Sequence, residues 1–589
     1  MVLFRKINFN FPTGYTLSLG FDEDGGCALP QTQRVLYINR IFYYLRIAVA
    51  SIVILWLIPV SILVNRIVPK PYMDEIFHVP QAQQYCRGNF RSWDPMITTP
   101  PGLYFLSLAY VASLFPGLFC MQAVSSFPDS CSTSILRLTN GVLSVLCSIL
   151  VYEIITHLRP SLDDKKATFR AVVLSLYPLH WFFTFLYYTD VASLTAVLAM
   201  YLLILKKKFL LSSLLGALSV LIRQTNIIWM LFVACAGVIE FTESHQRNSA
   251  EVVEFSRSKE KDDLSANRKG VSMISNLRKR RGGNGARDQN KFPSEIAVPM
   301  TYSSGLFDEI QNIIIISWNH FSELLVSFSP FFMVFVAFVA FVRWNGSIVL
   351  GAKDAHAVSP HFAQLLYFAA VSAVFMLPVH FSLGQVAVLF QQFRKNKLLN
   401  FFQWLMALTP SFLSVQFFSI AHPYLLADNR HYPFYLWRKV INFHWSTKYL
   451  MVPLYVYSWF SIVSNLARDQ KKLWVLVYFV ACAASLVPAP LIEFRYYTIP
   501  FFFLILHTNI TDHRSWLLMG VLYLSINCFT MYMFLFQPFS WKHEAGTQRI
   551  LVYFCSYLLD YTVGAGEENY SNSELSAICA DDKVHRMGT

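Results

Sequence analysis

The sequence is dominated by apolar segments about 20 residues long, the length that spans the hydrocarbon core of a bilayer as a helix. The candidate spans are 47–67, 134–157, 168–187, 190–205, 209–225, 226–241, 323–343, 361–381, 399–420, 447–466, 472–489, 496–510 and 516–536. Only helices and closed barrels satisfy their backbone polar groups in lipid. These segments therefore predict an all-α polytopic membrane protein with about 12–14 transmembrane helices.

The composition supports the same class. Of the 589 residues, 55% are hydrophobic and only 14% are charged, whereas soluble proteins carry about 25% charged residues. The net charge of +13 does not call for nucleic acid, because membrane proteins concentrate Lys and Arg in their cytoplasmic loops. We therefore expect membrane lipids, and no nucleic acid, as partners.

The ten cysteines lack the paired Cys and His spacing of zinc or iron–sulfur sites, so no metal or other cofactor is predicted. Cys86, Cys120 and Cys131 fall in a segment that we place in the lumen, where a disulfide is permitted. Their pairing does not follow from the sequence, and three free thiols fit it equally well.

Alternating spans with a cytoplasmic N-terminus place most of the Lys and Arg residues on the cytoplasmic side, in agreement with the positive-inside rule. The expected regions are a cytoplasmic segment 1–46, transmembrane helices 47–241 with a first lumenal loop 68–133, a basic disordered cytoplasmic loop 242–310, transmembrane helices 311–539 and a polar tail 540–589. The segment 102–119 is apolar enough either to span or to lie along the interface.

Polar residues gather in the segments that this alternation assigns to the lumen. They are Asp74, Glu75, His78, Trp93, Asp94 and Tyr104 in the first loop, Asp190, Arg223, Gln224, Asn226, His356 and His361 in the next boundaries, and Asp428, Asn429, Arg430, His431, Tyr432, Glu493, Arg495 and Tyr496 after the ninth and eleventh spans. Ionisable groups at membrane depth are costly and are functional candidates. Their placement on one face favours a lumenal site.

The residue types suit transfer of a sugar from a lipid phosphate. A hydroxyl acceptor needs a carboxylate to take its proton, and Asp74 or Glu75 supplies it. Forked guanidinium groups bind a departing phosphate well. We expect that phosphate site to comprise Arg223, Arg430, Arg495, His431 and His361. The substrate-binding residues would be His78, Trp93, Asp94, Tyr104, Asp190, Gln224, Asn226, His356, Asp428, Asn429, Tyr432, Glu493 and Tyr496.

Each of these residues also has a structural explanation. Asp74 and Asp190 could cap helices, and Arg223 and Arg495 could pair with carboxylates at helix ends. A boundary histidine is more often hydrogen-bonded than catalytic. A transporter or flippase of lipid-linked sugars would also carry buried charge, although transporters often have inverted repeats, which are not evident here.

Six of these segments closely resemble the terminal alpha-1,2-glucosyltransferases of N-glycan precursor assembly. They are PYMDEIFHVPQAQQYC (Pro71–Cys86), WDPMITTPPGLY (Trp93–Tyr104), FLYYTD (Phe185–Asp190), RQTNIIW (Arg223–Trp229), LLADNRHYPFYLWRKV (Leu425–Val440) and LIEFRYY (Leu491–Tyr497). The resemblance covers roughly residues 47–540, in the same order.

The resemblance implies a GT-C-type fold with its active site at the lumenal face of the endoplasmic reticulum. It also implies a dolichyl-phosphate-glucose donor, a dolichyl-diphosphate oligosaccharide acceptor, metal-independent inverting chemistry and an acidic base, Asp74 or Glu75, of which Asp74 is preferred. It favours an interfacial helix for 102–119. A GT-C mannosyltransferase with another donor is the nearest alternative within this class.

Overall fold

The computed structural model describes residues 44–114, 130–247, 305–422, 425–426, 430–540 and 547–549, apart from the side chains of Ala355 and Tyr432. It also describes the backbone of 7–10, 16–21, 27–28, 31–43 and 248–268. Asp428, Asn429 and Cys120 lie outside the described residues, as do 269–304 and 550–589.

The described chain is almost entirely helical. The helices of the N-terminal half are α1 (Gln31–Ile67), α2 (Glu75–Cys86), α3 (Gly102–Leu114), α5 (Thr133–Leu158), α6 (Asp164–Ser175), α7 (Pro178–Phe183), α8 (Thr189–Leu205), α9 (Phe209–Ile222) and α10 (Asn226–Arg268). Those of the C-terminal half are α11 (Leu306–Asn319), α12 (Phe321–Asn345), η2 (Asp354–His356), α13 (Ala363–Phe375), α14 (Leu377–His380), α15 (Leu383–Lys395), α16 (Lys397–Phe417), α18 (Tyr432–Tyr435), η3 (Leu436–Ile441), α19 (Thr447–Leu450), α20 (Val452–Leu466), α21 (Lys472–Leu486), η4 (Phe494–Tyr497), α22 (Thr498–His507) and α23 (His513–Phe536).

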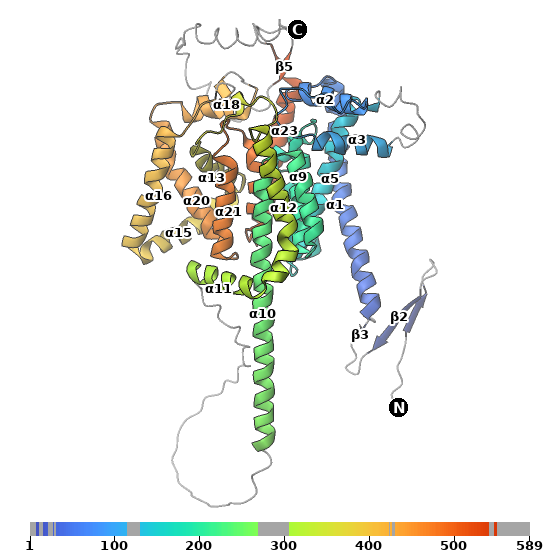
Figure 1. Cartoon of the computed structure of the whole chain (residues 1–589), viewed down its shortest axis with the longest axis vertical. Helices are drawn as coiled ribbons and strands as arrows, with labels where there is room; N and C mark the ends of the chain where they lie inside the picture. The colour runs from blue at the N-terminus through green and yellow to red at the C-terminus, as the bar shows by residue number, and fades with distance from the viewer. Residues whose placement is uncertain are drawn as a thin grey trace, which may run out of the picture.

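Short antiparallel strands occur at both ends. Strands β1 (Ile7–Asn10), β2 (Thr16–Phe21) and β3 (Cys27–Ala28) form one sheet in that order, and β4 (Pro538–Phe539) pairs with β5 (Gln548–Arg549). The β4–β5 pair brings the first part of the predicted polar tail back to the end of the bundle that carries α2 (Figure 1).

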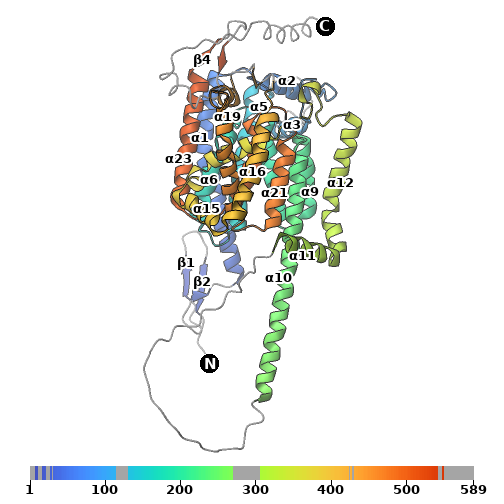
Figure 2. The same ribbon diagram turned by 90° about the vertical axis from the view of Figure 1, so that its left-hand side faces the viewer.

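The long helices stand side by side as a bundle, with α2 and α3 lying across one end (Figure 1). At the opposite end α11 lies across the bundle, and α10 continues beyond it in both views (Figure 2). The described part of the segment 102–119 is the helix α3, which lies along one end of the bundle.

Every segment predicted to span contains helix, but many of the helices are shorter than a full span. Among the described residues, six helices are long and apolar enough to cross a membrane: α1 from Tyr44, α5, α10 to Arg247, α12, α16 and α23. The helices α3, α8, α9, α13 and α21 are apolar and shorter. The chain is therefore a multi-pass, all-α membrane protein.

Burial explains why short apolar helices are tolerated. Helix α8 is apolar on all sides and nearly all of its side chains are buried, which is typical of a helix at the centre of a bundle. Helix α12 has the opposite character, because Phe331 is its one buried side chain while large apolar residues such as Phe332 and Met333 are exposed. Helix α12 accordingly presents a lipid-facing surface.

The structure departs from the expected disordered loop 242–310 at both edges. Helix α10 continues to Arg268, and α11 begins at Leu306. The sequence 242–268 contains no Gly or Pro, and 9 of its 27 residues are Glu, Lys or Arg, which favour helix even where an apolar stripe is lacking. Apolar periodicity alone therefore missed this extension.

The first loop is fastened by a disulfide between Cys86, the last residue of α2, and Cys131. This settles the pairing that the sequence left open. Helix α3 also packs closely on α9, because a Cβ atom on Gly102 would lie 2.5 Å from the carbonyl oxygen of Leu221. These two contacts hold the loop residues against the end of the bundle.

Candidate active site

The two adjacent acids, Asp74 and Glu75, point into different surroundings. Asp74 immediately precedes α2, and its side chain is 43% exposed. The Glu75 side chain, one residue later, is fully buried. Met73, just before them, has a φ of +56°, a left-handed conformation that non-glycine residues seldom adopt. This turn directs the two carboxylates to different partners.

Glu75 is a structural residue. Its carboxylate pairs with Arg137 of α5, at 2.5 Å from Nη2 to Oε2 and 2.8 Å from Nε to Oε1. The backbone amides of Tyr187 and Tyr72 donate to the same carboxylate at 2.6 Å and 3.0 Å. Because four donors surround it away from solvent, Glu75 joins the start of α2 to α5 and to the turn before α8.

Arg137 is the partner of Glu75 in this buried ion pair. It was not identified from the sequence as a functional or structural residue. It also donates to the carbonyl oxygens of Val68 and Lys70. A signal was present, because an arginine inside the apolar segment 134–157 requires a partner at membrane depth. The adjacent acids offered two carboxylates, and the buried one is that partner.

Asp74 faces Arg495 instead of capping α2. The Asp74 side chain makes no capping hydrogen bond, and its Oδ2 lies 3.1 Å from Nη1 of Arg495. Arg495 belongs to η4, and its Nε also pairs with Glu493. Its Nη1 lies 3.8 Å from Oδ2 of Asp190. Three carboxylates from distant parts of the chain thus converge on one guanidinium group.

Arg223 extends this cluster through Asp190. Nη1 of Arg223 lies 2.7 Å from Oδ1 of Asp190, and the Arg223 guanidinium is stacked over the ring of Tyr496 at 5.3 Å. Asp190 lies in the first turn of α8, whose N-cap is Tyr188. The alternative of Asp190 as an N-cap therefore fails, and its carboxylate bridges the two arginines.

The charges of the cluster set its protonation. Partial burial of Asp74 opposes its ionisation, but Arg495, with His78 and His431, holds the pKa of Asp74 below the ordinary 3.8. Burial lowers the pKa of His78 to about 4, against the opposing charge of Asp74. At neutral pH, Asp74 is therefore a carboxylate and His78 is a neutral imidazole.

His78 lies on the buried face of α2 and orders the residues beneath it. Its Nδ1 lies 2.6 Å from the hydroxyl oxygen of Tyr104, and the Trp93 ring packs edge-on against Tyr104. Asp94 accepts a hydrogen bond from the amide of Met96 through Oδ1. These first-loop residues form an aromatic layer that supports α2.

Four predicted site residues have structural contacts. Gln224 donates to the carbonyl of Thr98 at 3.1 Å, and Asn226 is fully buried against Ser193. His356 and His361 lie in the segment before α13, and each contacts a backbone group. The Nε2 atom of His361 accepts a hydrogen bond from the amide of Ile420, and Nδ1 of His356 lies 3.1 Å from the carbonyl oxygen of Ala352.

Arg430 contacts Tyr72, which lies two residues before Asp74 in the chain. Its guanidinium is 5.9 Å from the Tyr72 ring centroid, and its Nη1 donates to Gln548 of β5 at 3.1 Å. The backbone amide of Arg549 donates to the Tyr72 hydroxyl at 2.9 Å. The sequence did not predict these contacts of Tyr72 and Arg430 with β5, because β5 lies within the segment 540–589 that was expected to be a polar tail.

A small cleft opens beside Arg495. One wall is the apolar surface of α7, and the remaining lining combines the polar side chains of His431, Glu493 and Arg495 with Pro433 and Phe494. The lining residues are Pro178, Leu179, Phe182, Phe183, His431, Pro433, Glu493, Phe494 and Arg495. An apolar wall next to an arginine and a histidine matches a ligand with a hydrocarbon chain and an anionic head.

The comparisons with known proteins agree on one family. A family model described as the DIE2/ALG10 family matches residues 68–506. The chain is similar to a protein of Arabidopsis thaliana, with 59% identity over 86% of this chain and 99% of that protein. Relatives from Mus musculus and Homo sapiens are 33% and 31% identical, each over 83% of this chain and 94% of the relative.

All three relatives carry the name Dol-P-Glc:Glc(2)Man(9)GlcNAc(2)-PP-Dol alpha-1,2-glucosyltransferase. No solved structure matches the chain.

Proposed function

The chain belongs to the DIE2/ALG10 family, and we propose that Asp74 is the general base with which it transfers glucose from dolichyl-phosphate-glucose. The acceptor is the diglucosylated lipid-linked oligosaccharide Glc2Man9GlcNAc2-PP-dolichol, and the product linkage is alpha-1,2. The observation that carries the assignment of the base is the position of Asp74, half-exposed and 3.1 Å from Arg495 beside the cleft. Glu75, fully buried against Arg137, is left out of the chemistry.

The reaction is a single in-line displacement. The Asp74 carboxylate takes the proton of the 2-hydroxyl on the terminal glucose of the acceptor, and that oxygen attacks the anomeric carbon of the donor. The bond from the anomeric carbon to the phosphate oxygen breaks, and dolichyl phosphate leaves with the bonding electrons. Inversion at a beta-linked donor gives the alpha product, so no enzyme nucleophile is needed.

Arg495 links donor binding to activation of the base. In the structure its partners include Glu493, Asp190 and Asp74, and the first two fix its position. The donor phosphate takes the place of Asp74 at this guanidinium, because charge-assisted bonds to phosphate are strong. Asp74 then loses its main positive neighbour, its pKa rises, and it becomes a better base.

The cleft supplies the donor site. The apolar wall that includes Phe182 and Phe183 accommodates the first isoprene units of the lipid, while Arg495 and His431 lie at the polar side. Arg430, on the same loop as His431, adds positive charge to the donor phosphate. Arg223 acts through Asp190, by fixing the carboxylate that holds Arg495.

The membrane orientation follows from charge. The end of the bundle that carries α2 and η4 lies in the lumen of the endoplasmic reticulum, and the end with α11 and the extension of α10 lies in the cytoplasm. The support for this assignment is the concentration of Lys and Arg in segments on the α11 side.

The test is transfer by the purified full-length chain in lipid. Dolichyl-phosphate-glucose and diglucosylated acceptor are supplied, with dolichyl-phosphate-mannose in a parallel reaction, and the oligosaccharide mass is measured. We expect a gain of one hexose with the glucose donor alone. A gain with the mannose donor alone would favour the mannosyltransferase alternative. Movement of the oligosaccharide across the bilayer at unchanged mass would favour transport.

A further inference from the structure

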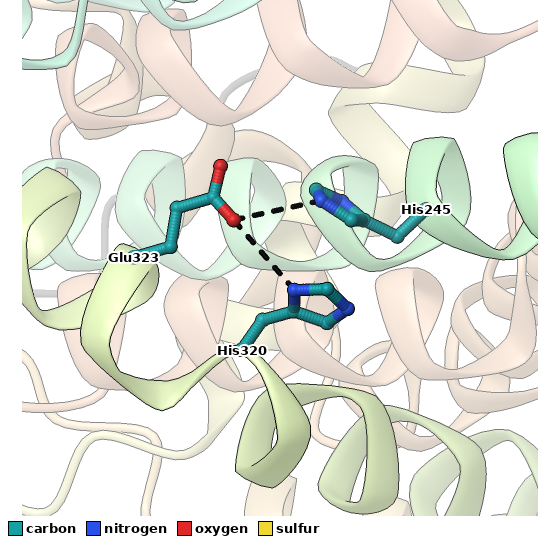
Figure 3. A group of neighbouring side chains, drawn as sticks. All are labelled: His245, His320 and Glu323. Atoms are coloured by element: carbon teal, nitrogen blue, oxygen red, sulfur yellow. Dashed lines mark ion pairs between the residues drawn. The ribbon is translucent and has the colours of Figure 1, made fainter.

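A second polar cluster lies at the end of the bundle opposite Asp74. It consists of His245 of α10, His320 between α11 and α12, and Glu323 in the first turn of α12 (Figure 3). One ligand atom from each residue lies within 4.8 Å of the other two. Two imidazoles and a carboxylate are the donor types that zinc prefers in proteins, together with thiolate.

The distances fit a shared cation better than direct bonds. Oε2 of Glu323 lies 3.6 Å from Nε2 of His245 and 3.6 Å from Nδ1 of His320. These separations exceed a hydrogen bond. Metal–ligand bonds of about 2.0–2.2 Å in a tetrahedron place neighbouring ligand atoms roughly 3.3–3.6 Å apart. The two distances from Glu323 to the histidines thus match the spacing of neighbouring ligands in such a site, and the two histidine nitrogens lie within 4.8 Å of each other.

The orientation of His245 is already fixed by its own helix. Its Nδ1 lies 3.0 Å from the carbonyl oxygen of Phe241, and the Phe241 ring packs at 4.2 Å from the imidazole. This contact turns Nε2 toward Glu323. Metal-binding histidines almost always use their second nitrogen in this way, to hold the ring and set the tautomer.

We propose that His245, His320 and Glu323 bind a zinc-class divalent cation. Two imidazoles select such a cation over Mg²⁺ or Ca²⁺, which prefer oxygen ligands. The Glu323 side chain is 56% exposed, so water completes the coordination and the site loads from the aqueous phase. The sequence showed no metal spacing because His245 is far from the other two ligands and only the fold joins them.

The cation fastens two halves of the chain and takes no part in glucosyl transfer. It joins α10 to the α11–α12 corner, on either side of the segment 248–304. Helix α10 begins at Asn226, close to Arg223 in the active-site cluster, and His245 lies about 28 Å further along it. At that distance a bound cation cannot touch the donor.

Isothermal titration of the full-length protein with ZnCl2 tests the site. The protein is purified with a non-histidine tag, stripped with EDTA and dialysed. We expect one site in the wild type. His245→Asn and His320→Asn each weaken zinc binding at least about tenfold, because even outer-shell contacts to a metal contribute 10–100-fold. Addition of Mg²⁺ gives no binding at this site.

Glu323→Gln is the variant least able to disturb folding, because the side chain is exposed and the replacement has the same shape. It too weakens binding about tenfold or more. His157→Asn is the matched control, an exposed histidine at the same end of the bundle, and it keeps wild-type affinity. Zinc also raises the melting temperature of the wild type but not of the double histidine variant.

Two results would overturn the proposal. One is a wild-type protein that binds no zinc, and the other is a His245→Asn/His320→Asn protein that binds it with unchanged stoichiometry and affinity.

Discussion

At the scale of single residues, the two neighbouring acids Asp74 and Glu75 have different surroundings and different partners. Asp74 and Glu75 are adjacent acids in the sequence, yet Asp74 faces Arg495 and Glu75 pairs with the buried Arg137. Glu75 contributes mainly to stability, because loss of its charge leaves the buried Arg137 without its carboxylate partner. We propose that Asp74 contributes mainly to the reaction.

The first prediction concerns stability. Glu75→Gln should destabilise the protein by about 3–5 kcal/mol, the usual cost of breaking a buried ion pair from one side. Asp74→Asn is the matched control, one residue away and half-exposed, and it should leave the melting temperature nearly unchanged. Thermal unfolding of the two purified variants measures the difference. Equal melting temperatures would show that Glu75 is not the buried partner described here.

The second prediction concerns pH. In the free enzyme Arg495 keeps the pKa of Asp74 below 3.8, so Asp74 stays ionised and kcat/KM for the donor stays flat down to about pH 5. With donor bound, the phosphate takes Arg495 and the pKa of Asp74 rises. The acid limb of kcat should therefore lie at higher pH than that of kcat/KM. Coincident limbs would contradict the exchange of partners at Arg495.

At the scale of elements, the short helices α2 and α3 determine where Asp74 lies, because local contacts hold each of them against the bundle. The turn at Met73, the Cys86–Cys131 disulfide and the close packing of α3 on α9 together position the start of α2. Small errors in these contacts would move Asp74 relative to Arg495.

The third prediction tests this packing. Gly102→Ala places a methyl group 2.5 Å from the Leu221 carbonyl oxygen, so α3 must shift, at a cost of about 1–3 kcal/mol. Both the melting temperature and transfer activity should fall. Gly384→Ala is the control, since a Cβ there meets nothing within 4 Å and alanine favours the helix. Equal stability of the two variants would show that α3 can move freely.

The helices themselves were largely predictable from sequence, because apolar length reports burial in lipid or in the bundle. Their edges were not: Pro178 divides the segment 168–187 into α6 and α7, and the polar end of α10 is helical without an apolar face. The sequence predicted only that Asp74, Asp190 and Arg495 lie on the same side of the membrane, and it did not predict that they contact one another. Their pairing depends on the left-handed turn at Met73 and on packing between distant segments, which spacing along the chain does not reveal.

At the scale of the whole molecule, α2, which Asp74 precedes, and the extension of α10 lie at opposite ends of the bundle. We propose that the lipid-linked donor and acceptor reach the α2 end, whereas the α11 end carries His245, His320 and the long extension of α10 (Figure 1). This separation makes orientation in the membrane testable by glycosylation of the protein itself.

The fourth prediction uses two glycosylation sequons. Arg91→Thr completes a sequon at Asn89, an exposed residue after α2, and it should acquire a glycan in the lumen. The natural sequon at Asn509, at the opposite end beside Arg159, should remain unmodified. Endoglycosidase-sensitive shifts in mobility report both sites. A glycan at Asn509 instead of Asn89 would reverse the orientation proposed here.

The most direct test of the account is the turnover of purified Asp74→Asn at saturating donor and acceptor. Asparagine has nearly the same shape but cannot accept the proton, so kcat should fall about 10²–10⁴-fold, with an unchanged melting temperature. Turnover close to that of the wild type would contradict the assignment of Asp74 as the general base.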